Sequence, residues 1–344
     1  MSSSPAKPAT AKSTTVMDRI LSIEIVRVTE RAAVSAARWR GRGNEKEADQ
    51  AAVDAMRREL NKLSIDGTVV IGEGERDEAP MLFIGERVGK KTGPKVDIAV
   101  DPLEGTTLCA KNMPGAIATM AMAAGGTLLN APDVYMDKIA IGPGYPNGVV
   151  DLDAPADQNI RALAKAKGVN PEDITALILE RPRHADLVAA VRKAGASVRF
   201  ITDGDVAGVI HTAEPDATGI DIYLGIGGAP EGVLAAAALA CIGGQIQGRL
   251  VLDTEEKRER ARKMGIKDPR KKYSMQDMVQ GDCVFSATGV TSGSMLQGVR
   301  FKPGVIETET VVMRSATGTV RWIRAEHRFL AKFDDKFNDK IRGE

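Results

Sequence analysis

Residues 96–106 read VDIAVDPLEGT, an apolar run that passes directly into an acidic turn. The β-branched residues before the Asp-Pro pair predict a buried β-strand. Asp101 and Glu104 are three residues apart in a turn that proline rigidifies, so their carboxylates can hold one divalent cation between them. Gly105 and Thr106 then offer backbone N–H groups and a hydroxyl to an anion. A cation beside such an anion cradle is typical of sites that cleave phosphate esters.

Other carboxylates also follow predicted strands. Glu73 and Glu75 come directly after a short β-branched strand, and Glu231 follows another strand across a glycine-rich turn. Acidic residues at strand ends converge on one rim of an α/β sheet, where ligands bind. Oxygen donors without Cys or His partners select Mg²⁺ or Mn²⁺. The alternative is that these acids cap the helices that follow, an interpretation that Pro230 favours for Glu231.

The pattern along the chain predicts an α/β protein in two parts. Residues 1–15 lack an apolar stretch and read as a disordered tail. We expect one α/β domain at residues 16–165 and a second at residues 166–335, where strands and helices alternate and imply mostly parallel pairing. Helices are predicted at residues 17–40, 44–63, 185–194, 230–241 and 255–264, and strands at residues 68–71, 96–100, 116–124, 138–142, 174–179, 197–201, 221–224, 283–287 and 307–314.

The composition excludes several classes of protein. The 344 residues include 47 Lys and Arg against 46 Asp and Glu, so a formal charge of +1 gives no field that would attract nucleic acid or an acidic membrane. Aromatic residues make up only 4%, too few for a surface that stacks single-stranded nucleic acid. The three cysteines form no CxxC pair, and no apolar run is long enough to span a membrane. We expect a cytoplasmic protein without nucleic-acid or membrane partners.

The turn at residues 101–106 resembles the Asp-Pro-(Ile/Leu)-(Asp/Glu)-Gly-Thr signature of the lithium-sensitive, Mg²⁺-dependent phosphomonoesterases, the superfamily of inositol monophosphatases and fructose-1,6-bisphosphatases. Glu104 stands in place of the second Asp of this signature, and in this the turn resembles that of the class II, bacterial-type fructose-1,6-bisphosphatases. This resemblance implies a layered α-β-α-β-α sandwich of the sugar-phosphatase type, two α/β halves with the site between them. It covers about residues 17–330 and includes, in the same order, the stretches at residues 70–82, 130–136, 181–184, 203–207, 225–232 and 285–289.

The same resemblance implies roles for individual residues. It places metal ligands for Mg²⁺ or Mn²⁺ at Asp49, Glu73, Asp101, Glu104 and Glu231. It implies that Asp77 and Thr106 form the pair that polarises the attacking water. It places the metal centre in the N-terminal domain and the sugar phosphate on the C-terminal domain. Substrate contacts are implied at Glu104, Gly105, Thr106, Tyr135, Arg181, Arg183, Asp203, Gly204, Asp205 and Gly228.

The implied activity is metal-dependent hydrolysis of the 1-phosphate of fructose 1,6-bisphosphate, and sedoheptulose 1,7-bisphosphate is a further substrate of that branch. A homo-oligomer, a dimer or a tetramer, is expected. An inositol-phosphate or other sugar phosphatase of the same superfamily is the first alternative. A dinucleotide-binding oxidoreductase is the second, because Gly225-Ile226-Gly227-Gly228 follows a strand, although Pro230 stands where the third glycine of that fingerprint belongs. A non-catalytic binding module is disfavoured, because several carboxylates at one rim are costly to keep without a metal.

Overall fold

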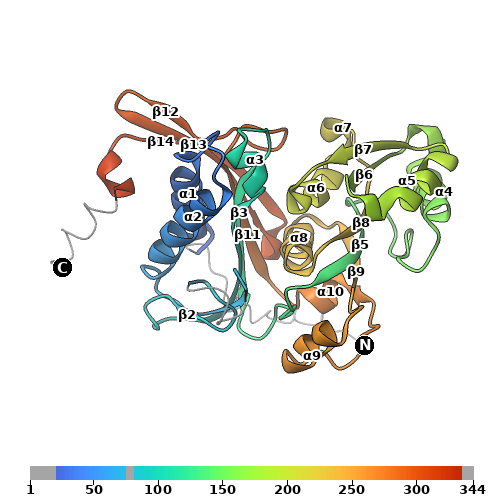
Figure 1. Ribbon diagram of the computed structural model, residues 1–344, viewed down its shortest axis with the longest axis horizontal. Coiled ribbons are helices and arrows are strands. Elements are labelled where there is room, and N and C mark those ends of the chain that lie inside the picture. Colours follow the sequence, from blue (N-terminus) through green and yellow to red (C-terminus); the bar gives the residue numbers. More distant parts are fainter. Residues whose placement is uncertain (1–20, 75–80, 335–344) are drawn as a thin grey trace, which may run out of the picture.

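The computed structural model describes residues 21–74 and 81–334, and two β-sheets form its framework (Figure 1). The first sheet has the strand order β12-β13-β11-β4-β3-β1-β2, and β14 also pairs with β13. Strands from both ends of the chain therefore share this sheet. Their bounds are β1 (Asp66–Ile71), β2 (Arg87–Val88), β3 (Lys95–Glu104), β4 (Ile117–Ala124), β11 (Cys283–Gly289), β12 (Arg300–Lys302), β13 (Val305–Arg314) and β14 (Thr319–His327).

The second sheet is built from the middle of the chain. Its order is β10-β9-β5-β8-β6-β7, so β5 and β8 occupy its centre. The described residues also form α-helices and five short 3₁₀ helices. The strand bounds are β5 (Tyr135–Ile141), β6 (Thr175–Leu179), β7 (Ser197–Ile201), β8 (Ile222–Gly228), β9 (Gln245–Leu250) and β10 (Tyr273–Ser274).

Helices cover both sheets and also fill the space between them (Figure 1). The helices α1 (Leu21–Ala37) and α2 (Glu45–Leu60) pack on the outer face of the first sheet, and α4 (Ala156–Lys167) and α5 (Ala185–Lys193) on the outer face of the second. The almost wholly apolar α8 (Ala229–Ile242) lies between the sheets and is buried along most of its length. The shorter α-helices are α3 (Thr106–Ala110), α6 (Asp205–Ile210), α7 (Pro215–Thr218), α9 (Glu255–Lys263) and α10 (Met275–Met278).

This arrangement confirms the expected mixed α/β fold with layers in the order α-β-α-β-α. An all-apolar helix suits the central layer because both of its sides face a sheet. No helix in the described ranges is long and apolar enough to cross a membrane.

The expectation of mostly parallel strands in the second part was wrong. Parallel pairing is confined there to β6 with β7 and β6 with β8, where helices make the crossovers between strands. Strand β5 pairs antiparallel with both β8 and β9. Strands that follow one another through turns, such as β13 and β14, pair antiparallel because a turn reverses the chain direction.

The sheets do not divide the chain at residue 165. Strand β5 precedes that point and belongs to the second sheet, whereas β11 to β14 follow it and complete the first sheet. Each sheet is therefore assembled from segments on both sides of the predicted boundary. Several elements were also missed, among them α4, β9 and β14: α4 lies in a polar segment with only a narrow apolar stripe, and β14 alternates weakly because its outer face is exposed.

Candidate active site

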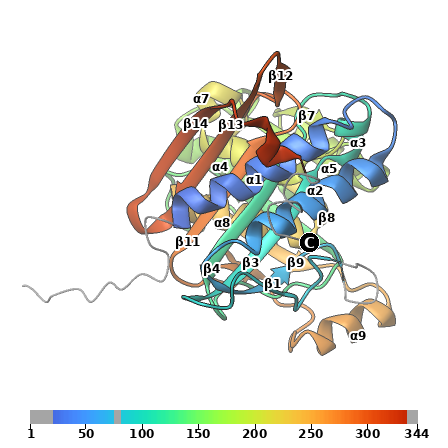
Figure 2. The same cartoon turned by 90° about the vertical axis from the view of Figure 1, so that its left-hand side faces the viewer.

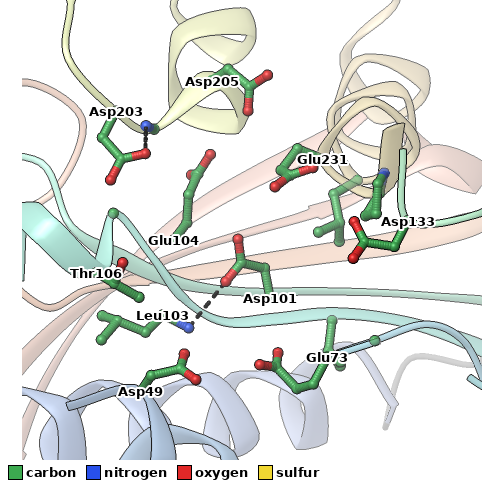
Figure 3. A pocket seen from close by; sticks show the side chains of 16 residues that line it. Asp49, Glu73, Asp101, Leu103, Glu104, Thr106, Asp133, Asp203, Asp205 and Glu231 are labelled. Atoms are coloured by element: carbon green, nitrogen blue, oxygen red, sulfur yellow. Dashed lines mark hydrogen bonds between the residues drawn. The ribbon is translucent and has the colours of Figure 1, made fainter. Parts of the chain in front are cut away.

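A cavity of about 280 Å³ lies between the two sheets, and acidic side chains dominate its lining (Figure 3). They come from α2, from the end of β1, from β3, from the segments just before β5 and α6, and from the first turns of α6 and α8. All five residues predicted as metal ligands contribute to this lining. The eight carboxylates are those of Asp49, Glu73, Asp101, Glu104, Asp133, Asp203, Asp205 and Glu231.

Asp49 and Glu73 approach the cavity from the same side in Figure 3. Asp49 lies on α2, which Asn44 caps by accepting a hydrogen bond from the backbone N–H of Glu47 at 3.2 Å. Glu73 follows β1 directly, where its backbone N–H donates to the carbonyl of Leu82. Gly72 is required here because a side chain would meet that carbonyl oxygen at 2.0 Å. The close approach of the two backbone segments thus sets the position of Glu73.

The acidic turn of residues 101–104 is an irregularity within β3 rather than its end. Asp101 lies opposite Thr119 and Glu104 opposite Ile117, so β3 carries one extra residue at this point. Proline is tolerated in such a bulge because the bulged residue donates no ladder hydrogen bond. Asp101 accepts a hydrogen bond from the backbone N–H of Leu103 at 3.1 Å, which closes the bulge. The expectation that the strand stops at Asp101 was therefore wrong.

Glu104 connects the first sheet to the second half of the molecule. The backbone N–H groups of Val206 and Ala207 donate to its two carboxylate oxygens at 2.5 and 3.3 Å. These groups belong to the first turn of α6, whose own N-cap residue is Gly204 and offers no side chain. Glu104 therefore caps a helix that lies about a hundred residues further along the chain. Glu104 also lines the acidic cavity.

Thr106 opens α3 directly after Gly105. Gly105 has a φ of +83°, a left-handed conformation that favours glycine. A side chain there would also meet Leu108 at 2.9 Å. The backbone therefore turns sharply between Glu104 and Thr106, and all three residues line the cavity.

Glu231 enters the cavity from the first turn of α8. Its Oε2 atom is buried and has no hydrogen-bond partner among the described residues. Near it, Lys138 of β5 is 1% exposed and donates hydrogen bonds to the Asp205 carboxylate and to the Gly228 carbonyl, the latter at 2.8 Å. One cation therefore holds Asp205 and the start of α8 in place beside an unpartnered carboxylate oxygen.

Burial raises the pKa of each of the five predicted metal ligands, and repulsion from acidic neighbours adds to this for all of them except Asp49. Burial raises the pKa of Glu73 to about 8, with Asp49 and Glu231 adding repulsion, and raises that of Glu231 to about 7. Burial alone raises the pKa of Asp49 to about 6. The pKa values of Asp101 and Glu104 lie well above their usual range, first because both are buried and next because acidic neighbours repel them.

Such a set of groups fits divalent cations. All the donors are carboxylate oxygens, the class that Mg²⁺ and Mn²⁺ prefer, and the orphan oxygen of Glu231 has no other partner in the described part of the chain. Within those same residues, no three acidic, His or Cys side chains are already gathered closely enough to hold an ion. Carboxylates that repel one another are expected to stand apart until a cation compensates their charge.

The residues predicted to contact substrate fall into three places. Gly105, Thr106, Asp203, Gly204 and Asp205 line the acidic cavity. Tyr135 and Gly228 lie opposite each other at the end of the β5–β8 pair, and the Arg183 guanidinium lies 4.7 Å from the centre of the Tyr135 ring. Arg183 also donates two hydrogen bonds to the carbonyl of Ile226. Arg181 lines a separate hollow beside Phe200.

Asp77 lies outside the described residues, so its place relative to Thr106 is not given. Two residues of the site were missed by sequence reasoning. Asp133 lines the cavity just before β5, and its signal was the same as that of the other acids, a carboxylate next to a strand end. Lys138 carries a charge in the apolar run of β5, which signals a buried ion pair.

The sequence of this chain matches a known protein family and is similar to proteins of that family from other organisms. The family profile described as "Bacterial fructose-1,6-bisphosphatase, glpX-encoded" matches residues 19–327. The chain belongs to this family. A protein from Synechococcus sp. (strain JA-3-3Ab), named D-fructose 1,6-bisphosphatase class 2/sedoheptulose 1,7-bisphosphatase, is 44% identical over 336 residues, which cover 90% of this chain and 96% of that protein. A protein of the same name from Trichodesmium erythraeum (strain IMS101) is 41% identical over 338 residues, 91% of this chain and 97% of that protein.

Among solved structures, inositol monophosphatase from Anabaena (Nostoc) sp. PCC 7120 is similar to this chain at a TM-score of 0.28 and 14% identity. The match covers 56% of this chain and 71% of that one. A likeness at this level says nothing about activity. The recognition of a bacterial fructose-1,6-bisphosphatase, made above from motifs, is confirmed by the family match and by the two relatives.

Proposed function

We propose that the acidic cavity hydrolyses the 1-phosphate ester of fructose 1,6-bisphosphate to fructose 6-phosphate and phosphate. The observation that carries this proposal is the family match over residues 19–327, which includes every described carboxylate of the cavity. Because the named relatives combine two activities in one name, sedoheptulose 1,7-bisphosphate is proposed as a second substrate. A cytoplasmic location and a homo-oligomer stay predictions.

We assign the divalent cations to Asp49, Glu73, Asp101, Glu104 and Glu231. These residues supply oxygen donors from both sides of the cavity, and the burial that raises their pKa values favours compensation of their charges by a cation. Mg²⁺ or Mn²⁺ bound there would lower the pKa of a water molecule and neutralise charge on the phosphoryl oxygens. The unpartnered oxygen of Glu231 is the donor most directly available.

The protein's own groups would then orient the reaction. Water attacks phosphorus, the bond from phosphorus to the sugar C1 oxygen breaks, and the leaving oxygen takes up a proton. We propose that Thr106, fixed at the start of α3, accepts the proton of the attacking water while its own hydroxyl donates to Asp77. Because the sequence offers no recognisable Ser–His or Cys–His arrangement, we expect no covalent phosphoenzyme.

The second phosphate and the sugar need groups away from the metal centre. Arg183, beside Tyr135 at the end of β5, is proposed to hold the distal phosphate with its guanidinium. Arg181, which lines a separate hollow, stays a prediction for the same role. Asp203 is proposed to accept a sugar hydroxyl. Asp205 stays a prediction, because one of its oxygens is held by Lys138.

A phosphate-release assay tests the proposal. The protein is freed of metal with EDTA and assayed with fructose 1,6-bisphosphate, sedoheptulose 1,7-bisphosphate and inositol 1-phosphate, with and without added Mg²⁺ or Mn²⁺. We expect no turnover in EDTA, recovery with a divalent cation, and preference for the two bisphosphates. Full activity in EDTA would overturn the metal assignment, and preference for inositol 1-phosphate would overturn the substrate. Inhibition by Li⁺ is expected as well.

A further inference from the structure

A second cavity, of about 480 Å³, lies beside the connection between α1 and α2 and is rich in arginine. Residues 38–42 read RWRGR, and all three arginines of this stretch line the cavity. Its other lining residues are Ala37, Asn112 and Phe301. None of these six residues belongs to the lining of the acidic cavity.

The three arginines have no acidic partner in the described part of the chain. Arg40 is anchored by hydrogen bonds to the carbonyls of Val290 and Val299, at 3.2 and 2.8 Å. Arg38 and Arg42 are exposed and lie against aromatic rings: the Arg38 guanidinium is 5.5 Å from the centre of the Phe301 ring, and that of Arg42 is 5.8 Å from the centre of the Trp39 ring. Three guanidinium groups gathered without a carboxylate repel one another, and an anion would relieve that repulsion.

Phe301 adds a contact of a different kind. Its side chain is 43% exposed on the β12–β13 hairpin, and it lines the same cavity as the arginines. An exposed aromatic ring beside guanidinium groups suits a ligand that carries both a charged and an apolar part. We propose that this cavity binds a phosphate ester, with the phosphoryl group between Arg38 and Arg42 and the organic group against Phe301.

The cavity is connected to the acidic site through the backbone. Gly41 and Gly43 donate hydrogen bonds to the carbonyls of Cys109 and Ala110, both at 3.0 Å, so the loop of residues 38–43 is tied to the end of α3. Figure 2 shows this loop beside α3. Thr106 begins α3, and the α2 helix that follows the loop carries Asp49. A ligand that pulls the arginines together would therefore move two elements of the proposed catalytic site.

Trp39 offers a direct readout of binding. The chain contains two tryptophans, and Trp322 lies on β14 and lines a different hollow. In a Trp322→Phe protein, fluorescence therefore comes from Trp39, on which Arg42 is stacked. Phenylphosphonate is the probe, because it carries a phosphate-like dianion and a ring and cannot be hydrolysed as an ester. We expect a saturable change in fluorescence, and no change would overturn the proposal.

Matched variants separate this site from other anion binding. Arg38→Gln with Arg42→Gln, in the Trp322→Phe protein, should weaken binding of phenylphosphonate by about ten-fold or more. Arg161→Gln with Lys165→Gln removes two exposed charges from α4 and should leave the affinity unchanged. A signal that survives the first pair, or that both pairs weaken equally, comes from another site or from general attraction and would overturn the proposal.

Two further measurements test the ligand class and the connection. Phenylphosphonate should bind more tightly than inorganic phosphate, and Phe301→Ala should remove the difference. Equal affinities in the parent protein would overturn the place given to the organic group.

The connection to catalysis rests on the proposed function. Saturating phenylphosphonate should change kcat for fructose 1,6-bisphosphate in the parent but not in the Arg38→Gln, Arg42→Gln protein. An equal effect in both proteins would overturn the connection to catalysis. The fluorescence experiment would still decide whether the cavity binds the probe.

Discussion

Glu104 accepts a hydrogen bond from the backbone N–H of Val206 at 2.5 Å, across the space between the two halves of the molecule. The same carboxylate is a proposed metal ligand, so one side chain both caps α6 and faces the cation site. Residues 203–205, which are assigned to substrate contacts, lead directly into the turn that Glu104 caps. Metal binding and the placement of this part of the sugar site are therefore coupled through Glu104.

The two roles of Glu104 can be separated by substitution. Glu104→Gln keeps an oxygen that accepts from Val206 but loses the charge, so Mg²⁺ should raise the melting temperature of this variant less than that of the parent. Glu104→Ala loses the cap as well and should be less stable without metal by about 0.5–2 kcal/mol. Thermal melts with and without Mg²⁺ measure both effects. Equal Mg²⁺-induced shifts in all three proteins would contradict the assignment.

Gly228 tests the position of Glu231. Its φ of −68° is open to any residue, but a side chain there would meet the Glu231 Oε2 atom at 1.8 Å. Gly228→Ala should therefore displace that carboxylate without straining the backbone and lower kcat/KM on the order of 10²-fold. Gly125→Ala is the control, because its new methyl group would lie 3.4 Å from Lys95, an ordinary contact. Normal turnover in Gly228→Ala would argue against a role for Glu231.

Several site residues could be predicted from local sequence. Glu73, Asp101 and Glu231 stand where an apolar run gives way to a glycine- or proline-containing turn, a change of pattern that predicts a strand end. At Asp101 the structure has a bulge within β3 instead. Asp49 has no such signal, because on α2 it resembles an ordinary half-exposed helix residue. Only the family resemblance indicated it. These residues line one cavity because of the order of the strands in the two sheets, and a local sequence pattern does not predict that order.

The long-range contacts could not be predicted. Glu104 of β3 caps α6 and Lys138 of β5 pairs with Asp205, and both contacts depend on where α6 lies between the two sheets. The antiparallel centre of that sheet has the same origin, since β5 joins it from a segment that precedes the strand–helix alternation. Tertiary packing, rather than the properties of single segments, decides these features.

Arg183 distinguishes substrate binding from catalysis. If its guanidinium holds the distal phosphate, Arg183→Ala should raise KM for fructose 1,6-bisphosphate by about ten-fold or more and change kcat little, because the contact is the same in the ground state and the transition state. Arg183→Lys keeps the charge but loses the paired donors that contact Ile226, so its effect should be intermediate. Steady-state kinetics would contradict this role if kcat fell while KM stayed constant.

His327 should make the protein sensitive to acid. Burial, with Lys332 nearby, lowers its pKa from 6.5 to about 4, and its ring contacts Thr308 and Lys332 at 3.0 and 2.8 Å. The unfolded chain binds this proton at a higher pH than the folded chain. The free energy of unfolding therefore falls as the pH drops from about 6.5 to about 4, by at most about 1.4 kcal/mol per pH unit for one proton.

Urea denaturation between pH 4 and pH 8 measures this effect. His327→Gln should be less stable than the parent at pH 8, where it loses the hydrogen bonds of the neutral ring, by about 1 kcal/mol. The difference should shrink or reverse as the pH falls toward 4. Curves that stay parallel across the range would show that another group causes the acid sensitivity.

Thr106 and Asp77 are proposed to act as one unit in activating water. Asp77→Asn keeps the size of the side chain but removes the proton acceptor, and Thr106→Val removes the hydroxyl. Each should lower kcat on the order of 10²–10⁴-fold, the range for loss of a general base. In Asp77→Asn the affinity for substrate should change little, because no substrate contact is assigned to Asp77.

The double variant decides whether the two residues work together. Because groups that act as a unit give losses that do not add, Asp77→Asn with Thr106→Val should be hardly slower than either single variant. Thermal melts confirm folding, and Thr107→Val is a control on the same turn of α3, since Thr107 is absent from the lining of the acidic cavity. Strictly additive losses would show that each residue acts alone. Near-normal turnover in Asp77→Asn would leave Thr106 without a proton acceptor and would contradict the proposed pair.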